Sequence, residues 1–328
     1  MSRGISRRHM LGGCIGALAL SNRLWAAQAD SFPSKPIRFV VPFAPGGSTD
    51  ILARIVGRHM FPGSGQAVVV ENVPGAGGNI GATQVARSPA DGYTLEIGSM
   101  STHAMDDSLY RKLSFDPVGD FQTVAMLAYA INAIAVSSKL PVKNLDELLA
   151  YIRAHPGKLN YASGGIGSHN HLTMALLAKV ANLDIVHVPY KGGGPAVTAL
   201  VRGECDMFAG GASLLLPYVK SGQVRLIAVT EPRRYAGLPD IPSVSELIKG
   251  FKVTNWYGVF GPKGMSTERT QLLNKEINHI TALPEVAERF KTLAMVRDPL
   301  TPTELHAMLE ADHKLWATTI KSLSISPE

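Results

Sequence analysis

Apolar residues along this chain follow two spacings, one typical of buried strands and the other typical of amphipathic helices. Residues 37–41 are mostly β-branched or aromatic, whereas the apolar residues of 51–56 recur at helical spacing. The pattern predicts strands at 37–42, 67–71, 93–99, 159–162, 185–188, 206–209, 224–230 and 255–260, with further apolar runs at 123–128 and 132–137. It predicts helices at 48–60, 78–87, 144–155, 168–181, 195–202, 214–221, 267–281, 284–293 and 303–323. This alternation indicates an α/β fold with largely parallel sheets.

The length and order of these elements indicate two lobes. At 328 residues the chain exceeds the usual size of one domain. A second strand–helix series begins after the Leu140-Pro141 pair, and irregular chain separates it from the first series. Three helices at the end have no new strands to cover, so we expect them to pack back on the first lobe.

The first 29 residues resemble an export signal, with a basic start, an apolar stretch and small residues before Ala29. We therefore expect a periplasmic protein whose signal peptide is removed by cleavage after Ala29. The adjacent Arg7 and Arg8 leave both twin-arginine and general secretory export open. Four arginines lie in this segment, so the formal charge of +6 falls to +2 without it (6 − 4), and no basic stripe remains to bind nucleic acid.

Cys205 is the only cysteine after the signal, so the mature chain has no intramolecular disulfide. Its neighbours Glu204 and Asp206 supply no cation to lower its pKa. We expect a buried, unreactive thiol.

The segment 42–50, Pro-Phe-Ala-Pro-Gly-Gly-Ser-Thr-Asp, lies between a predicted strand and a predicted helix. Its two glycines let backbone N–H groups approach a ligand, and the start of the helix favours a carboxylate or phosphate. An ordinary βα turn is the alternative.

Three further glycine clusters, 74–81, 163–171 and 188–195, also join a strand to a helix. The first lacks the dinucleotide fingerprint, because Ile80 stands where a third glycine is needed. His169 and His171 diverge on their helix and have no evident third ligand, so we predict no metal site. Lys191 in the last cluster either attracts an anion or is simply solvated.

Motifs for catalysis are missing. The chain has no Gly-x-Ser-x-Gly, no phosphate-binding Gly-Lys-Ser/Thr loop and no His-Glu-x-x-His. His103 and His171 could each act as a base, but spacing places no nucleophile beside either. We expect no enzymatic activity and no cofactor.

In order along the chain, several motifs resemble the tripartite tricarboxylate transporter receptors, the Bug or TctC family of periplasmic solute-binding proteins. The resemblance covers about residues 34–321. The motifs are 42–50, Glu-Asn-Val-Pro-Gly-Ala-Gly-Gly-Asn-Ile-Gly-Ala at 71–82, Asp-Gly-Tyr-Thr at 91–94, Leu-Asn-Tyr-Ala-Ser at 159–163, His-Val-Pro-Tyr-Lys-Gly at 187–192, Pro-Asp-Ile-Pro at 239–242 and Trp-Tyr-Gly at 256–258.

The resemblance implies a two-lobed type II periplasmic binding protein (a Venus flytrap), each lobe a mixed, mostly parallel sheet flanked by helices. After a signal peptide at 1–29, lobe 1 would comprise 30–135 and 256–328, and lobe 2 would comprise 136–255. The protein would capture a small carboxylate-bearing solute and deliver it to a tripartite tricarboxylate-type membrane transporter. We expect a monomer.

The family holds carboxylates mainly by backbone amides and water, and its pattern implies ligand-binding residues at matching positions. These are Phe43, Ala44, Gly47, Ser48, Asp50, Asn79, Ser101, Thr102, His103, Ser163, Gly167, His171 and Tyr190. Asp50 would either cap its helix or meet a ligand amine. One departure is Ala-Met-Asp-Asp at 104–107, which adds two carboxylates near the cleft and argues against a highly anionic ligand such as citrate.

Two alternatives remain open. A receptor of the same fold could report its ligand state to a sensor kinase. A secreted α/β enzyme could use His103 or His171 as a base.

Overall fold

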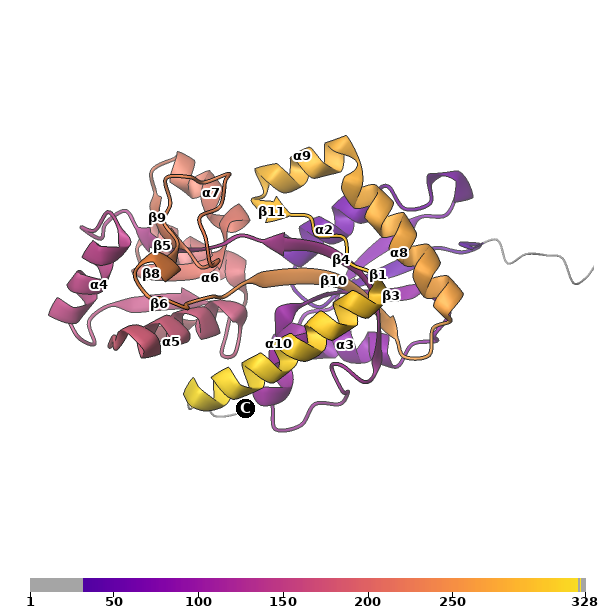
Figure 1. The fold of residues 1–328 in the computed structure, drawn as a ribbon, viewed down its shortest axis with the longest axis horizontal. Coiled ribbons are helices and arrows are strands. Elements are labelled where there is room, and N and C mark those ends of the chain that lie inside the picture. The colour runs from indigo at the N-terminus through magenta and orange to yellow at the C-terminus, as the bar shows by residue number, and fades with distance from the viewer. Residues whose placement is uncertain (1–31, 324, 326–328) are drawn as a thin grey trace, which may run out of the picture.

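The computed structural model describes residues 32–323 and residue 325; the predicted signal segment lies outside these residues. Figure 1 shows two lobes joined by long strands. The described strands form a six-stranded sheet in one lobe and a five-stranded sheet in the other. The first has the order β11-β4-β10-β3-β1-β2, built from β1 (Ile37–Val41), β2 (Val68–Asn72), β3 (Thr94–Ser99), β4 (Phe121–Ala130), β10 (Asn255–Pro262) and β11 (Met295–Val296). The second has the order β7-β6-β8-β5-β9, built from β5 (Asn132–Ser137), β6 (Asn160–Ser163), β7 (Val186–Pro189), β8 (Met207–Gly211) and β9 (Val224–Val229).

Most strands within each sheet point the same way, as predicted. In the first sheet β1 is parallel to β2 and β3, and β4 shares their direction because both β3 and β4 pair antiparallel with β10. In the second sheet β6 is parallel to β7 and β8, and only β5 runs against its neighbours. Of the reversed strands, β5 and β10 each enter a lobe from the other one, and the third is the short edge strand β11.

The chain crosses between the lobes at two places. Ile131 alone separates β4 from β5, and residues 230–254 lead from β9 back to β10. The predicted boundary between 135 and 136 falls inside β5, whose residues pair with β8 and β9. The predicted boundary at 255/256 falls one residue inside β10. The first crossing continues a buried apolar strand, so local composition does not mark it.

The predicted helices are present, with ends shifted by a few residues. They are α2 (Ser48–Gly57), α3 (Asn79–Ala86), α4 (Leu145–Ala154), α5 (His169–Ala181), α6 (Gly193–Arg202), α7 (Ala212–Lys220), α8 (Thr267–Ala282), α9 (Pro284–Thr292) and α10 (Pro302–Leu323). The chain after β3, predicted as irregular, forms a π-helical turn at Ser101–Met105 and a 3-10 turn at Asp106–Ser108. Further 3-10 turns lie at Pro62–Ser64, Ala76–Gly78 and Val244–Glu246.

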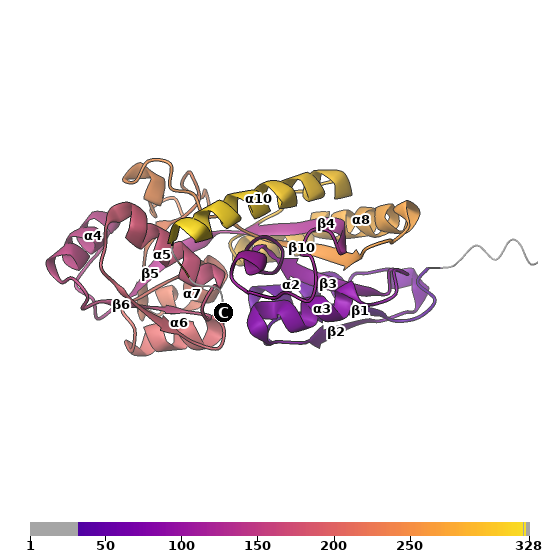
Figure 2. The same ribbon diagram turned by 90° about the horizontal axis from the view of Figure 1, so that it is seen from below.

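The C-terminal helices pack on the first lobe, as expected, and α10 also reaches the second. Asn274 of α8 donates to Val124 O of β4, and Trp316 Nε1 of α10 donates to Met100 Sδ at 3.2 Å. Farther along α10, Ser322 O accepts from Lys179 Nζ of α5. Figure 2 shows α10 running along both lobes. Among the described residues, no helix combines the length and apolarity needed to span a membrane.

Candidate functional site

The glycine-rich loops lie at the carboxyl ends of parallel strands in both sheets, where α/β folds bind ligands. Loops of the first lobe meet at Gly78, because a Cβ built there would lie 2.6 Å from Thr102 Cγ2 and 3.3 Å from Phe43 Cζ. Loops of the second lobe meet where Gly192 N donates to Gly164 O at 3.1 Å. The predicted turns therefore converge within each lobe.

The two sets of loops also face each other across the lobes. A Cβ built on Gly211, at the end of β8, would lie 3.7 Å from Ser48 Oγ at the start of α2. A Cβ built on Gly167 would lie 2.7 Å from Leu109 Cδ1 of the first lobe. We call the loops after β1, β2 and β3 and those after β6, β7 and β8 the facing loops.

Four helices that begin at the facing loops have glycine at the N-cap. In the described chain, α2, α3, α6 and α7 have no side-chain cap, and their N-cap residues are Gly47, Gly78, Gly192 and Gly211. By contrast, α4 and α8, which begin elsewhere, are capped by Asn144 and Ser266, and α5 is capped by Ser168. Uncapped helix starts leave N–H groups and partial positive charge for an anion. The facing loops therefore suit a carboxylate.

Ser48 is held in place at this junction. Its side chain is buried and hydrogen-bonds with the hydroxyl of Tyr257, which accepts from Asn255 Nδ2 at 2.9 Å. The backbone of the same loop is anchored where Phe43 O accepts from Asn72 Nδ2 at 3.0 Å. Strand β10, which follows the second crossing between the lobes, thus orients the start of α2.

The Asp50 carboxylate is already occupied by the protein. It accepts from Gly46 N at 3.0 Å and from Arg54 Nη2 at 2.8 Å. Burial alone would raise the pKa of Asp50, but the hydrogen bonds from Arg54 and Gly46 hold it below its usual value. Asp50 therefore stabilises the loop as an ionised group that Arg54 neutralises, through Gly46 N before the helix rather than through an N–H group of α2.

The third-strand loop is fixed from inside the first lobe. Thr102 Oγ1 accepts from Ser99 N and donates to Ser99 O, both at 3.1 Å. His103 is fully buried, stacks on Phe260 at 3.8 Å and has Nδ1 2.9 Å from Pro117 O. Its other nitrogen, Nε2, lies 3.3 Å from Glu96 Oε2. The His103 ring therefore packs against the turn from the interior of the first lobe. Ser101, at the start of the turn, is half-buried and so more exposed than Thr102 and His103.

The two extra carboxylates of 104–107 do not face the loops as free charges. Asp106 is buried, and burial together with the nearby Glu96 and Asp107 raises its pKa well above the usual value. Asp107 Oδ2 lies 2.6 Å from His313 Nε2 of α10. Asp107 thus links the turn to α10, whereas the Asp106 carboxyl group is enclosed in the interior of the first lobe.

Sequence reasoning missed a column of stacked rings behind the second-lobe loops. His171 and His187 stack at 3.9 Å, and Tyr161 lies over His187 at 5.0 Å. His187 Nε2 is 2.6 Å from Ser163 Oγ, and Gly167 N donates to His171 Nδ1 at 3.0 Å. Because Nδ1 accepts, neutral His171 carries its proton on Nε2 and is a hydrogen-bond donor there.

Two other predicted residues have distinct placements. Asn79 is buried at the start of α3, and its Oδ1 has no partner among the described residues. Tyr190 directs its hydroxyl to Cys205 Sγ at 3.4 Å, so the hydroxyl is engaged within the second lobe. Cys205 is buried, as predicted. No group of described side chains could hold a metal ion.

Gly211 was also missed, although it carries the same signal as the other clusters. The pair 210–211 lies between a strand and a helix, as do the loops that were singled out. Whether the thirteen predicted residues contact a solute stays a prediction.

The buried histidines should make folding stability depend on pH. Burial, and for His171 also the neighbouring His187, lowers the pKa of His169, His171 and His187 to about 4. Their unfolded pKa is near 6.5, so below pH 6.5 the unfolded chain binds protons that the native protein excludes. Stability should therefore fall as the pH drops from 6.5 toward 4, with no such change above 6.5.

The His171→Asn variant tests this dependence, because its Oδ1 can replace Nδ1 as the acceptor for Gly167 N without titrating. Between pH 7 and 5 the variant should lose roughly 1 kcal/mol less than the wild type, allowing for partial exposure of the ring. Thermal unfolding at both pH values measures the difference. His155→Asn, on the exposed end of α4, is the control; equal losses in wild type and His171→Asn would contradict the assignment.

Comparisons with protein families, with related sequences and with solved structures all indicate the same family. Residues 52–323 match the model of the tripartite tricarboxylate transporter family receptor. The "UPF0065 protein in tcbD-tcbE intergenic region" of Pseudomonas sp. strain P51 is 37% identical over 318 residues, 96% of this chain and 94% of that protein.

Solved structures agree. Rpa4515 of R. palustris, solved with adipate, is 31% identical with a TM-score of 0.87, over 90% of this chain and 100% of that one. The periplasmic binding protein BugD is 32% identical with a TM-score of 0.84, over 90% and 100%. MatC from Rhodopseudomonas palustris, solved with bound malate, is 32% identical with a TM-score of 0.82, over 88% and 100%.

Proposed function

Because this chain belongs to the tripartite tricarboxylate transporter receptor family of periplasmic solute-binding proteins, we propose that it captures a small carboxylate-bearing organic solute between its lobes and delivers it to a tripartite tricarboxylate-type membrane transporter. Family and fold are those of solute-binding receptors rather than enzymes, so the alternative of catalysis by His103 or His171 is set aside. We further propose that the chain is exported to the periplasm.

The observation that carries the proposal is the uncapped start of α2 beside that of α7. The two helices belong to different lobes, and the Cβ position of Gly211 is 3.7 Å from Ser48 Oγ. A carboxylate placed there would accept hydrogen bonds from backbone N–H groups of both lobes. Only a solute that contacts both lobes stabilises the closed form, so binding becomes a shift in the population of closed protein.

The charge balance of the site favours a carboxylate without an ammonium group. The acidic group of the first loop, Asp50, is paired with Arg54 and Gly46 N. Neutral donors, such as the uncapped N–H groups at the start of α2 and His171 Nε2, remain for the solute. A dicarboxylate fits such donors better than an amino acid does, in keeping with adipate and malate in two similar proteins.

Titration calorimetry against a panel of carboxylates tests the proposal, with small-angle scattering before and after to detect closure. Adipate, malate and succinate should include a binder that compacts the protein, whereas glutamate and aspartate should bind at least tenfold more weakly than the matching dicarboxylates. Failure of every carboxylate in a broad panel to bind or compact the protein would overturn the proposal.

Removing Arg54 should weaken carboxylate binding. In Arg54→Ala the charge of Asp50 is no longer neutralised, so it repels a solute carboxylate at the start of α2. We expect about a tenfold loss of affinity, relieved by added salt. Arg58→Ala removes an exposed arginine just after the same helix and should leave the affinity unchanged. An equal effect of both variants would show that general charge, and not the Asp50 pair, is responsible.

A further inference from the structure

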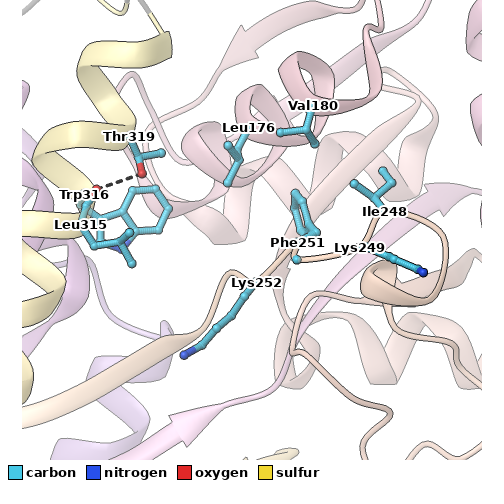
Figure 3. Close-up of a pocket in the computed structure, with 10 residues that line it drawn as sticks. Leu176, Val180, Ile248, Lys249, Phe251, Lys252, Leu315, Trp316 and Thr319 are labelled. Carbon is cyan, nitrogen blue, oxygen red and sulfur yellow. Dashed lines mark hydrogen bonds between the residues drawn. The ribbon is translucent and has the colours of Figure 1, made fainter.

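A surface groove lies between α5, α10 and the chain that returns to β10 (Figure 3). Its volume is about 290 Å³. Side chains of Phe251 and Trp316, each 4% exposed, are part of its lining, and Val180 and Leu315 flank it with 49% and 57% of their surface exposed. The lining residues are Leu176, Val180, Ile248, Lys249, Gly250, Phe251, Lys252, Leu315, Trp316 and Thr319. Exposed apolar side chains gathered around one groove are typical of an interaction site.

The walls of this groove belong to different lobes. Leu176 and Val180 lie on α5 of the second lobe, whereas Leu315 and Trp316 lie on α10, which packs on the first sheet. Between them, residues 248–252 are part of the second crossing. A lobe movement that shifts α5 relative to α10 would therefore change the width of the groove.

The groove is also connected to the facing loops through a residue that packs beneath one of them. Trp316 lines the groove and donates from Nε1 to Met100 Sδ at 3.2 Å. Met100 directly precedes the π-helical turn Ser101–Met105. The Trp316 side chain thus connects the groove to the turn that follows β3, which is one of the facing loops.

Charge at the groove is positive. Lys249 and Lys252 are both exposed, and none of the described residues that line the groove is acidic. Asp312 interacts electrostatically with Lys252, and its Oδ2 already accepts a hydrogen bond from Trp256 Nε1 at 2.7 Å. The groove therefore complements a segment with a carboxylate beside an apolar side chain.

We propose that this groove is the docking surface for the membrane component that receives the solute, through an extracytoplasmic segment that pairs an apolar side chain with an Asp or Glu. The inference rests on the proposed function. Because the groove has one wall from each lobe, the partner would bind the closed and open forms with different affinity, which is what delivery requires.

Photo-crosslinking in the producing bacterium tests this surface without knowledge of the solute. The crosslinking residue benzoylphenylalanine replaces Leu315, or Leu272 on α8 as the control, because Leu272 is also exposed, at 40%. Position 315 should give an adduct with an integral membrane protein, identified by mass spectrometry, and position 272 should not. Lys252→Glu should reduce the adduct at least fivefold, while Lys275→Glu on α8 should not.

Purified Lys252→Glu should keep the wild-type unfolding temperature and affinity for the panel carboxylate, within about twofold, so loss of docking is separated from loss of folding or of solute binding. No adduct at position 315, or an adduct only with a second copy of this chain or with a soluble protein, would overturn the docking surface. Failure of the proposed function would appear instead as wild-type protein that binds no carboxylate.

Discussion

Aspartate in place of Gly211 should abolish carboxylate binding and leave the fold at least as stable as the wild type. Gly211 has φ −53° and ψ 127°, a conformation that any L-residue adopts. Its Cβ position lies 3.5 Å from Ser213 Oγ and 3.7 Å from Ser48 Oγ, so the new carboxylate would extend between α7 and α2. There it would cap α7 and take the place proposed for the solute's carboxylate.

The expected loss is large because two negative charges would share one site. At about 4 Å and an effective dielectric constant near 20, the repulsion is roughly 4 kcal/mol, or about a thousandfold in affinity. Capping by aspartate in place of glycine adds only a few tenths of a kcal/mol, so the unfolding temperature should stay within about 2 °C or rise. Calorimetry and thermal unfolding measure the two effects.

Gly211→Ala is the matched control. Its methyl group would make ordinary van der Waals contacts and carry no charge, so affinity should stay within about threefold of wild type. If the aspartate variant still binds the wild-type solute, the space between α2 and α7 is not the carboxylate site. If alanine also abolishes binding, packing rather than charge controls that position.

The second large effect is expected at Gly81, where alanine should lower both stability and affinity. A Cβ at this position of α3 would lie 2.9 Å from both Pro42 Cα and Val73 O. These are backbone atoms, which cannot move aside cheaply, and they lead into the first and second facing loops. Overpacking of this kind costs roughly 1–3 kcal/mol, which exceeds the gain of about 1 kcal/mol from alanine in a helix.

We expect the unfolding temperature of Gly81→Ala to fall by about 3–6 °C and the affinity for a carboxylate to fall at least tenfold. Gly194→Ala is the control, because Gly194 also lies in a helix but has no neighbour within 4 Å of its Cβ position. The control should be neutral or slightly stabilising. Equal stability of Gly81→Ala and wild type would show that α3 can shift away from Pro42 without cost.

Much of the site follows from local pattern. Glycines between a strand and a helix predicted the loops after β1, β2, β6 and β7, since strand ends, turns and helix starts depend on neighbouring residues. The same signal at 210–211 would have identified the start of α7. The two-residue strand β11 is too short to show a period, and the π-helical turn after β3 has no apolar repeat that distinguishes it from loop.

Other features depend on residues that are distant along the chain. The family resemblance implied His103 as a ligand contact, and contact with a solute stays a prediction. Its enclosure by Phe260 and Glu96 inside the first lobe was not predictable from the neighbouring residues. His187 lies sixteen positions after His171 and becomes its stacking partner only when β7 pairs with β6 (187 − 171 = 16). Stacking and burial of this kind require the folded sheet.

The sequence by itself determined an α/β chain with glycine-rich helix starts, because periodicity, turn residues and helix capping act over a few neighbouring positions. Only the tertiary structure decided that the starts of α2 and α7 face each other, that Arg54 neutralises the buried Asp50, and that α10 forms a groove with α5. The physical reason is that these arrangements depend on how two separately formed sheets pack about the crossings at Ile131 and 230–254.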